Sequence, residues 1–303
     1  MDTIVEELEL IGQKARAAAR KMAFLSTEVK NRALENIAAG LKGREAEVLA
    51  ANAQDLVVGR AAGLSDAMLD RLLLTPERLS GMAADVRAVA ALPDPVGRTY
   101  DMRTMPNGLQ IGRRRVPLGV IATIYESRPN VTVDIAALCL KSGNAVILRG
   151  GKEATSSNLA LVRVVQGAAA LAGVPEGAVQ FIENQDRELV GQLLKMRDYI
   201  DLVVPRGGAG LIKFVVENST IPVVAGGIGV VHVYIDASAE PEMAAAIAYN
   251  SKVQRPTVCN AMDTLLVHSS AAERCLPAVG QAWGKAGVEV HGDGRTIQLL
   301  SHI

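Results

Sequence analysis

Residues 116–149 read VPLGVIATIYESRPNVTVDIAALCLKSGNAVILR, and this stretch determines the fold class. It begins with a nearly continuous apolar run from Gly119 to Tyr125, which predicts a buried strand. Residues 131–141 have the spacing of a helix, and Ala145–Leu148 form a second apolar run. A strand, a helix and a second strand in this order predict a βα unit of a parallel sheet.

The same alternation continues towards the C-terminus. We expect helices at 154–172 and 188–196, with strands at 178–182 and 200–204. A glycine cluster at 226–229 follows, and beyond it a strand-like run begins a further βα pattern. The sequence therefore predicts an α/β protein, with a parallel-sheet domain over residues 1–227 and the start of a second α/β domain over residues 228–303.

The N-terminal part of the first domain has a helical pattern over residues 2–92. Thr75-Pro76-Glu77 predicts a helix start, because Thr caps the free N–H groups and Pro suits the first helical position. Pro93 and Pro95 interrupt this pattern. Asn107-Gly108 then predicts a protruding hairpin near residues 100–116, with a two-residue turn in which both residues have positive φ.

Composition narrows the classes of function. The chain of 303 residues has 32 Lys+Arg and 32 Asp+Glu, which gives no indication of a nucleic-acid or membrane partner. No run approaches the about 20 apolar residues that a membrane-spanning helix needs, and the acidic N-terminus is unlike a signal peptide. We therefore expect a cytoplasmic α/β protein with no nucleic-acid or membrane partner.

Cys259 stands in SKVQRPTVCNA (residues 251–261), between a predicted helix and a predicted strand. A cysteine attacks through its thiolate, which needs electropositive surroundings, and Lys252 and Arg255 could supply them. Taken alone, the position fits a small buried side chain more often than a nucleophile. The other two cysteines, Cys139 and Cys275, lie in apolar helical patterns and are expected in the core.

Two glycine pairs follow predicted strands and could bind phosphate. Neither the GxGxxG fingerprint nor a Walker A loop is present. Gly207 and Gly208 mark a strand-to-helix turn, where phosphate oxygens can approach free N–H groups. Arg149 and Lys152 flank the other pair at a strand end, which suits a ribose phosphate. Two such turns on neighbouring βα units together favour a phosphate-binding edge.

A third polar turn, YESRPN (residues 125–130), also follows a predicted strand. Asn130 could donate to a developing oxyanion, and Arg128 could bind an acidic group of the substrate. Helix capping and surface charge are open alternatives for these two residues. No metal site is expected, because the sequence has no HxH or HxxxH spacing.

In combination, the ESRPN, LRGGKEA, PRGG and QRPTVCN stretches resemble the γ-glutamyl phosphate reductase family of the aldehyde dehydrogenase superfamily. The resemblance covers the whole chain. It implies an aldehyde dehydrogenase-like fold and the NADPH-dependent reduction of L-glutamyl 5-phosphate to L-glutamate 5-semialdehyde and phosphate, the second step of proline biosynthesis. Residues 1–227 would bind NADPH, and residues 228–303 would form an incomplete catalytic domain.

The resemblance also implies roles for single residues. Cys259 matches the catalytic cysteine of the family, which becomes a thioester during turnover. Asn130 fits the oxyanion donor only loosely, because the loop differs in length from that of ordinary aldehyde dehydrogenases. Arg128 and Arg255 are expected to bind the phosphate or the α-carboxylate of the substrate.

The cofactor residues follow by the same analogy. Arg149 and Lys152 would meet the adenosine ribose and its 2′-phosphate, which favours NADPH over NADH. The Gly207-Gly208 turn would face the pyrophosphate.

Two departures from the family pattern matter. Ordinary aldehyde dehydrogenases carry a glutamate before a Gly-Gly pair to hydrolyse the thioester, whereas Val224-Ala225-Gly226-Gly227 has no carboxylate here. This difference favours acyl-phosphate reduction, since a hydrolytic base would destroy the acyl-enzyme. The chain is also shorter than members of the family, so we expect a C-terminal truncation, as a fragment or as a natural product.

Several alternatives stay open on the sequence alone. The chain could be another acylating aldehyde dehydrogenase that uses coenzyme A, or a truncated remnant without catalytic activity. The resemblance implies a homo-oligomer for the intact enzyme and allows association with glutamate 5-kinase. It leaves open whether the 303-residue chain is itself active.

Overall fold

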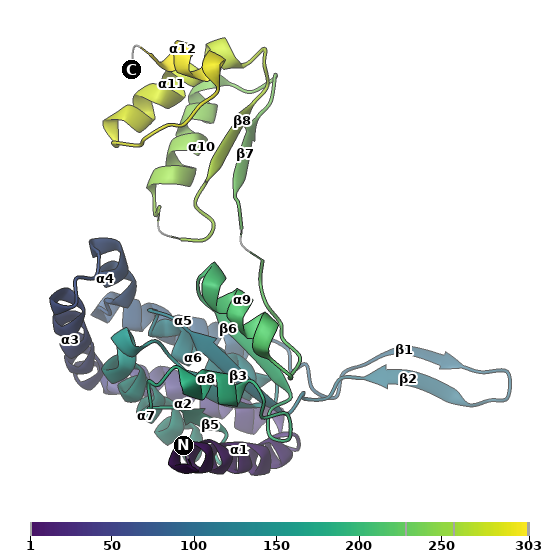
Figure 1. Ribbon diagram of the computed structural model, residues 1–303. Coiled ribbons are helices and arrows are strands. Elements are labelled where there is room, and N and C mark those ends of the chain that lie inside the picture. The colour runs from purple at the N-terminus through teal and green to yellow at the C-terminus, as the bar shows by residue number, and fades with distance from the viewer. Residues whose placement is uncertain (1, 228, 257, 302–303) are drawn as a thin grey trace. The chain divides into compact units, whose positions relative to one another are not determined.

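The stretch at 116–149 forms the centre of a parallel sheet in the computed structural model of the chain (Figure 1). The structure describes residues 2–227, 229–256 and 258–301. This described part divides into two units, Met1–Gly226 and Gly227–Ile303.

The sheet of the first unit has the strand order β5-β4-β3-β6, with all neighbours parallel. In the pairing, Val120 of β3 lies opposite Ala145 of β4, and Ile121 lies opposite Leu202 of β6. The central strands are almost wholly buried, which explains their continuous apolar runs. Their bounds are β3 (Val120–Tyr125), β4 (Ala145–Arg149), β5 (Val179–Phe181) and β6 (Leu202–Arg206).

The direction of the strand connections decides which helices cover which face. The chain moves from β3 to β4 through α6 (Asn130–Lys141) and from β4 to β5 through α7 (Thr155–Leu171), then returns to β6 through α8 (Glu188–Leu193). Because such crossovers are right-handed, α6 and α7 lie on one face and α8 on the other. After β6, α9 (Ala209–Asn218) leads to a parallel bridge on the far side of β6. The turns after β3 and β6 therefore leave towards opposite faces, which makes their boundary the switch point of the sheet.

The N-terminal helices complete the first unit, as the pattern over residues 2–92 predicts. One of them, α1, packs on β3, β4 and β5, while α2, α3 and α5 pack around α6 and α7. The predicted start of α5 is confirmed, because Thr75 Oγ1 accepts a hydrogen bond from the Arg78 N–H at 3.2 Å. The helices are α1 (Asp2–Met22), α2 (Thr27–Gly43), α3 (Glu45–Ala61), α4 (Asp66–Leu72) and α5 (Pro76–Ala91).

The predicted hairpin is present, but the predicted turn type is wrong. Strands β1 (Thr99–Thr104) and β2 (Gln110–Arg114) pair antiparallel and project as a ribbon from the first unit (Figure 1). Gly108 has φ +84°, whereas Asn107 does not have positive φ. The Gly108 N–H donates to Met105 O at 2.9 Å, so Pro106 occupies the first central position of the turn. Its fixed φ of about −65° suits that position of a type I turn, which a left-handed glycine then completes.

Gly119 lies just before β3, where there is no room for a side chain. Its backbone conformation is also unfavourable for any residue other than glycine. Its φ is +125°, and a β-carbon there would collide with Asp201 Oδ2. Asp201 cannot easily move, because it accepts hydrogen bonds from the Val120 N–H and from Arg16, both at 2.7 Å.

We therefore expect Gly119→Ala to lower the free energy of unfolding by about 2 kcal/mol or more. Gly81→Ala is the matched control, since Gly81 lies exposed in α5 with nothing within 4 Å of its β-position. That control should stabilise the chain by about 0.5–1 kcal/mol. Chemical denaturation of the three proteins measures both values, and an unchanged midpoint for Gly119→Ala would contradict the described packing.

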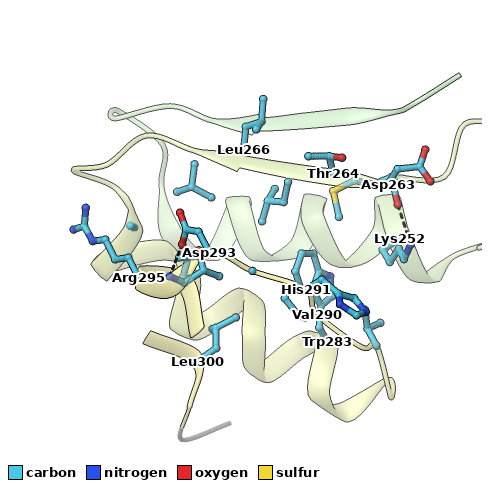
Figure 2. A pocket seen from close by; sticks show the side chains of 18 of the residues that line it. Lys252, Asp263, Thr264, Leu266, Trp283, Val290, His291, Asp293, Arg295 and Leu300 are labelled. Carbon is cyan, nitrogen blue, oxygen red and sulfur yellow. Dashed lines mark hydrogen bonds between the residues drawn. The ribbon is translucent and has the colours of Figure 1, made fainter. Parts of the chain in front are cut away.

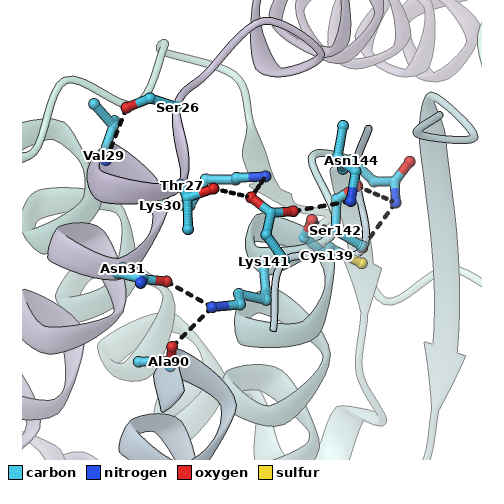
Figure 3. Close-up of polar contacts among 12 residues, drawn as sticks. Ser26, Thr27, Val29, Lys30, Asn31, Ala90, Cys139, Lys141, Ser142 and Asn144 are labelled. Carbon is cyan, nitrogen blue, oxygen red and sulfur yellow. Dashed lines mark hydrogen bonds and ion pairs between the residues drawn. The ribbon is translucent and has the colours of Figure 1, made fainter. Parts of the chain in front are cut away.

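A cluster of buried polar groups joins α2, α6 and the break after α5 (Figure 3). The Lys30 ammonium lies 2.5 Å from Asp94 Oδ2 and is almost wholly buried. On the neighbouring helix, Lys141 Nζ donates to Asn31 Oδ1 at 2.6 Å and to Ala90 O at 2.7 Å. These contacts fix the proline-containing segment against the helices that cover the sheet.

The second unit has its own sheet and core. The strands β7 (His232–Ile235) and β8 (Thr264–Val267) pair in parallel, as a βα unit requires. Their core includes Cys275 and Trp283. The helices of this unit are α10 (Pro241–Val253), α11 (Ala272–Lys285) and α12 (Gly294–Leu300). Across the described residues of both units, none of the helices combines the length and apolar character that crossing a membrane requires.

Candidate functional site

The polar turns singled out in the sequence lie at one edge of the first unit's sheet. The segments after β3, β4 and β6 all begin at the carboxyl ends of neighbouring strands. Tyr125, the last residue of β3, lies opposite Arg206, the last residue of β6. In open parallel sheets ligands bind at this edge, outside the switch point. The order of the strands thus brings together the YESRPN, LRGGK and PRGG stretches.

A carboxylate of the protein contacts the Gly207-Gly208 turn. The Gly208 N–H, at the N-terminus of α9, donates to Glu126 Oε2 at 2.8 Å. A β-carbon on Gly207 would lie only 2.6 Å from the same oxygen. The close approach that the glycines permit is therefore made by Glu126, at the positive end of the helix dipole.

The glycine pair after β4 is approached by side chains as well. A β-carbon on Gly150 would collide with Asn158 Nδ2, and one on Gly151 would collide with the Glu153 carboxylate. Glu153 Oε1 also accepts hydrogen bonds from Ser127, at 2.7 Å from its N–H and 2.5 Å from its hydroxyl. Ser127 has φ +37°, which is uncommon for a residue with a β-carbon. Glu153 thus fixes the loop after β3 in an unfavourable conformation.

The two cations expected at the cofactor lie on this same turn. Arg149, at the end of β4, donates through Nη2 to Gln185 O at 3.1 Å. Its Nε is buried and has no hydrogen-bond partner among the described residues, and the same holds for Gln185 Oε1. Burial lowers the pKa of Arg149, the attraction of Glu153 works against this shift, and the repulsion of Arg187 adds to it. Lys152 is exposed to solvent.

The two residues expected to contact substrate from the loop after β3 are half-buried. Asn130 is the first residue of α6, and its Nδ2 donates to Asp134 Oδ2 at 2.9 Å. That bond uses one of the two N–H groups of the amide and fixes its orientation. Burial raises the pKa of Asp134, although the Asn130 hydrogen bond works in the opposite direction. Arg128 contributes its carbonyl to the same turn, accepting from the Val131 N–H at 3.1 Å.

Cys259 lies in the second unit, on the loop between α10 and β8, and it is exposed. The interpretation as a small buried side chain is therefore wrong for this cysteine. Its loop is attached at both ends. The Met262 N–H donates to Ser251 O at 2.9 Å, and Lys252 Nζ donates to Met262 O at 3.1 Å. Asp263 Oδ2 accepts from the Val231 N–H at 2.9 Å, which ties the loop to the start of β7.

The other residues of the QRPTVCN motif neighbour this cysteine along the chain. Arg255 is exposed, and its carbonyl accepts from the Val258 N–H at 3.3 Å. Thr257 lies outside the described residues. A β-carbon on Gly229 would lie 3.4 Å from Cys259 O, so the glycine segment passes close to the cysteine backbone.

The other two cysteines are buried, as their apolar patterns predict. Burial raises the pKa of the Cys139 thiol to about 12, so this group stays protonated at neutral pH. Among the cysteines, only Cys259 is placed where a solvent-borne substrate can reach its sulfur.

A pocket of about 460 Å³ opens in the second unit between β8, α11 and the segment before α12 (Figure 2). Its lining includes the apolar side chains of Trp283 and Leu300. The polar side chains of Lys252, His291 and Arg295 also line it, with Arg295 at the opposite end from Lys252 and His291. Neither Cys259 nor Arg255 lines it. This pocket therefore does not contain the candidate nucleophile.

Two acidic residues of the edge were missed by the sequence interpretation, although both stand inside quoted motifs. Glu126 opens ESRPN, and Glu153 belongs to LRGGKEA. The available signal was their place in the sequence, since Glu126 directly follows β3 and Glu153 lies in the turn after β4. Residues in such turns lie at the ligand-binding edge of a parallel sheet.

Comparison with known proteins agrees with this arrangement. Residues 3–296 match the Aldehyde dehydrogenase family. The chain is 59% identical over 302 residues to the γ-glutamyl phosphate reductase of Dehalococcoides mccartyi, covering 100% of this chain and 71% of that protein. It is 57% identical to the enzyme of that name from Roseiflexus castenholzii, covering 97% of this chain and 70% of the relative.

Solved structures give the same result. The crystal structure of γ-glutamyl phosphate reductase from Thermotoga maritima superposes with a TM-score of 0.90 at 42% identity, covering 98% of this chain and 72% of that one. An acetylating aldehyde dehydrogenase from Geobacillus thermoglucosidasius has a TM-score of 0.67 at 18% identity over 96% of this chain and 69% of its own, which shows the common fold. The chain therefore belongs to the aldehyde dehydrogenase family and, within it, to the γ-glutamyl phosphate reductases.

Proposed function

We propose that the protein reduces L-glutamyl 5-phosphate to L-glutamate 5-semialdehyde, with release of phosphate. The observation that carries this proposal is the exposed Cys259 on a loop fixed at both ends, in a chain of the γ-glutamyl phosphate reductase family. The reaction converts an activated carboxyl group to an aldehyde, which requires a covalent acyl carrier and a hydride donor.

In the proposed reaction, the Cys259 thiolate attacks the acyl carbon of the substrate. The carbon–oxygen bond to phosphate breaks, phosphate leaves with the electron pair, and a thioester forms on Cys259. After reduction of that thioester, the thiohemiacetal on the same sulfur expels the thiolate and releases the aldehyde. Asn130 is the proposed donor to the carbonyl oxygen, its amide oriented by Asp134. Arg128 and Arg255 are proposed to hold the phosphate or the α-carboxylate.

The residues at the sheet edge fit a dinucleotide with a ribose phosphate. The buried Nε of the half-buried Arg149 has no hydrogen-bond partner among the described residues, and Lys152 is exposed. Both cations suit the adenosine ribose and its 2′-phosphate, which supports NADPH as the cofactor. When bound, NADPH supplies the hydride. The Gly207-Gly208 turn is the proposed pyrophosphate position, although Glu126 contacts it here. Residues 1–227 would then be the cofactor domain and residues 228–303 part of the catalytic domain.

The sequence around the second glycine cluster supports reduction rather than oxidation. Val224 is exposed, and the stretch from Val224 to Gly227 has no carboxylate that could activate water. A thioester that survives hydrolysis can accept a hydride. We also propose that the protein is cytoplasmic, as expected for an enzyme of amino-acid biosynthesis.

The ribbon of β1 and β2 supports a homo-oligomer. Its strands are exposed along their whole length, including the apolar side chains of Met102 and Ile111. The unpaired N–H and C=O groups of such exposed strand edges offer a template on which a strand of another chain can pair. Equilibrium sedimentation tests this part of the proposal, and a monomer of the complete gene product at micromolar concentration would refute it.

The reverse reaction tests the function. The complete gene product, incubated with glutamate semialdehyde, phosphate and NADP⁺, should form NADPH, and omission of phosphate should stop turnover. The absence of NADPH from an otherwise folded protein would refute the assignment. Replacement of phosphate by coenzyme A distinguishes the alternative, because faster turnover with coenzyme A would indicate another acylating aldehyde dehydrogenase.

A further inference from the structure

The hydrogen bond between Glu126 and Gly208 lies across the switch point of the sheet. Gly208 N–H donates to Glu126 Oε2 at 2.8 Å, and the missing β-carbon of Gly207 lets the same carboxylate approach the turn. The two turns leave towards opposite faces, and the crevice between such turns is where open sheets bind ligands. The Glu126 side chain therefore occupies the Gly208 N–H, a donor that a bound anion would need.

The backbone on both sides directs Glu126 into this position. Before it, Tyr125 pairs with Arg206, and the Glu126 N–H donates to Arg206 O at 3.2 Å. After it, the N–H and hydroxyl of Ser127 both donate to Glu153, which holds Ser127 at φ +37°. Such a conformation persists only where its surroundings enforce it. The direction of the Glu126 side chain is thus set by the fold rather than by an unrestrained surface loop.

A carboxylate and a pyrophosphate compete for the same place. Both are stabilised by the positive end of α9, and one N–H of Gly208 cannot serve both. The negative charges of Glu126 and of a pyrophosphate at this turn would also repel each other. A dinucleotide must therefore displace Glu126 before its pyrophosphate reaches the turn. Its apparent affinity falls with the fraction of molecules in which the turn is open.

We propose that Glu126 sets the affinity of the cofactor site, as an internal carboxylate that competes with the cofactor pyrophosphate for the N-terminus of α9. This role of Glu126 rests on the proposed function, because it requires a dinucleotide at the sheet edge. A ligand that lacks a pyrophosphate does not meet the competition.

Substitution of Glu126 tests the proposal by binding alone. In calorimetric titrations of the 303-residue chain, Glu126→Ala should lower the Kd for NADPH about tenfold. The Kd of Glu126→Gln should lie between those of Glu126→Ala and the wild type, because the amide keeps a hydrogen-bond acceptor but loses the negative charge. Adenosine 2′,5′-bisphosphate, which has no pyrophosphate, should bind all three proteins equally. An unchanged or increased Kd for NADPH in Glu126→Ala would overturn the proposal.

Glu217→Ala is the matched control, since Glu217 is an exposed carboxylate near the other end of α9, 3.8 Å from Lys213. It should leave the Kd for NADPH unchanged. If Glu217→Ala gained as much affinity for NADPH as Glu126→Ala, the effect would come from the net charge of the protein, and competition at the turn would be refuted. Inorganic pyrophosphate separates this proposal from the proposed function. If no variant binds NADPH while Glu126→Ala alone gains affinity for pyrophosphate, the cofactor assignment fails and the competition stands.

Discussion

Replacement of Cys259 by alanine should reduce reductase turnover by at least about a thousandfold, because no acyl-enzyme can form without its sulfur. Cys259→Ser should be nearly as inactive, since a hydroxyl at neutral pH is a far weaker nucleophile than a thiolate. Cys259 is exposed and lies outside the buried core of its unit, so both variants should fold. The measurement is the rate of NADPH formation in the reverse reaction, normalised to folded protein.

Cys139→Ala is the control for this loss of a thiol. Cys139 is buried in α6, and its raised pKa of about 12 keeps the thiol protonated. The control should therefore retain wild-type turnover. Activity that survives in Cys259→Ala but disappears in Cys139→Ala would contradict the assignment of the nucleophile.

The second large effect concerns stability. Lys30→Met should lower the free energy of unfolding by about 3 kcal/mol or more, because it leaves Asp94 without the buried ammonium that neutralises it. In the ion pair, the Lys30 side chain is 1% exposed and that of Asp94 is 12% exposed. Lys42→Met, on the exposed side of the same helix, should change stability by less than about 0.5 kcal/mol. Equal losses in the two variants, measured by chemical denaturation, would show that the buried pair has no special role.

The ion pair of Lys30 and Asp94 also predicts that the stability of the protein depends on pH. Burial acts to raise the pKa of Asp94, but hydrogen bonds from Lys30, from Thr27 and from the Val96 N–H outweigh it and lower the pKa. A carboxyl whose pKa is lowered on folding contributes stability above its unfolded pKa of about 3.9, and that contribution disappears as the pH falls through the folded pKa.

The difference in unfolding free energy between wild type and Asp94→Asn should therefore be constant near neutral pH and should narrow below about pH 4. Denaturation curves at a series of pH values measure this difference. A difference that widens on acidification would contradict the described pair.

The elements of the fold could be predicted because their signals are local. The apolar runs at 119–125 and 145–148 predict β3 and β4, and Thr75-Pro76 predicts the start of α5. The Asn107-Gly108 pair alone predicts the wrong turn geometry, because the preceding proline also restricts the backbone. Pro106 fixes its own φ, so the turn begins one residue earlier and only Gly108 takes positive φ.

The candidate site could be predicted only in part, because its contacts join residues far apart in the chain. Glu126 and Gly208 are 82 residues apart, and only the strand order β4-β3-β6 brings them together. No local pattern fixes that order, so the glycine turn alone predicts a phosphate site but not its contact with Glu126. Cys259 could be singled out, since its place between a predicted helix and strand is itself a local feature.

The central claim is that the acyl group is carried by Cys259, and one measurement tests it most directly. The complete gene product is incubated with glutamate semialdehyde and NADP⁺ without phosphate, so that the acyl-enzyme accumulates, and is then acid-quenched, digested and analysed by mass spectrometry. We predict a glutamyl group on the peptide that contains Cys259, and its loss when phosphate is added before the quench. NADPH formation with the acyl group on another residue, or with no acylated peptide, would contradict the account.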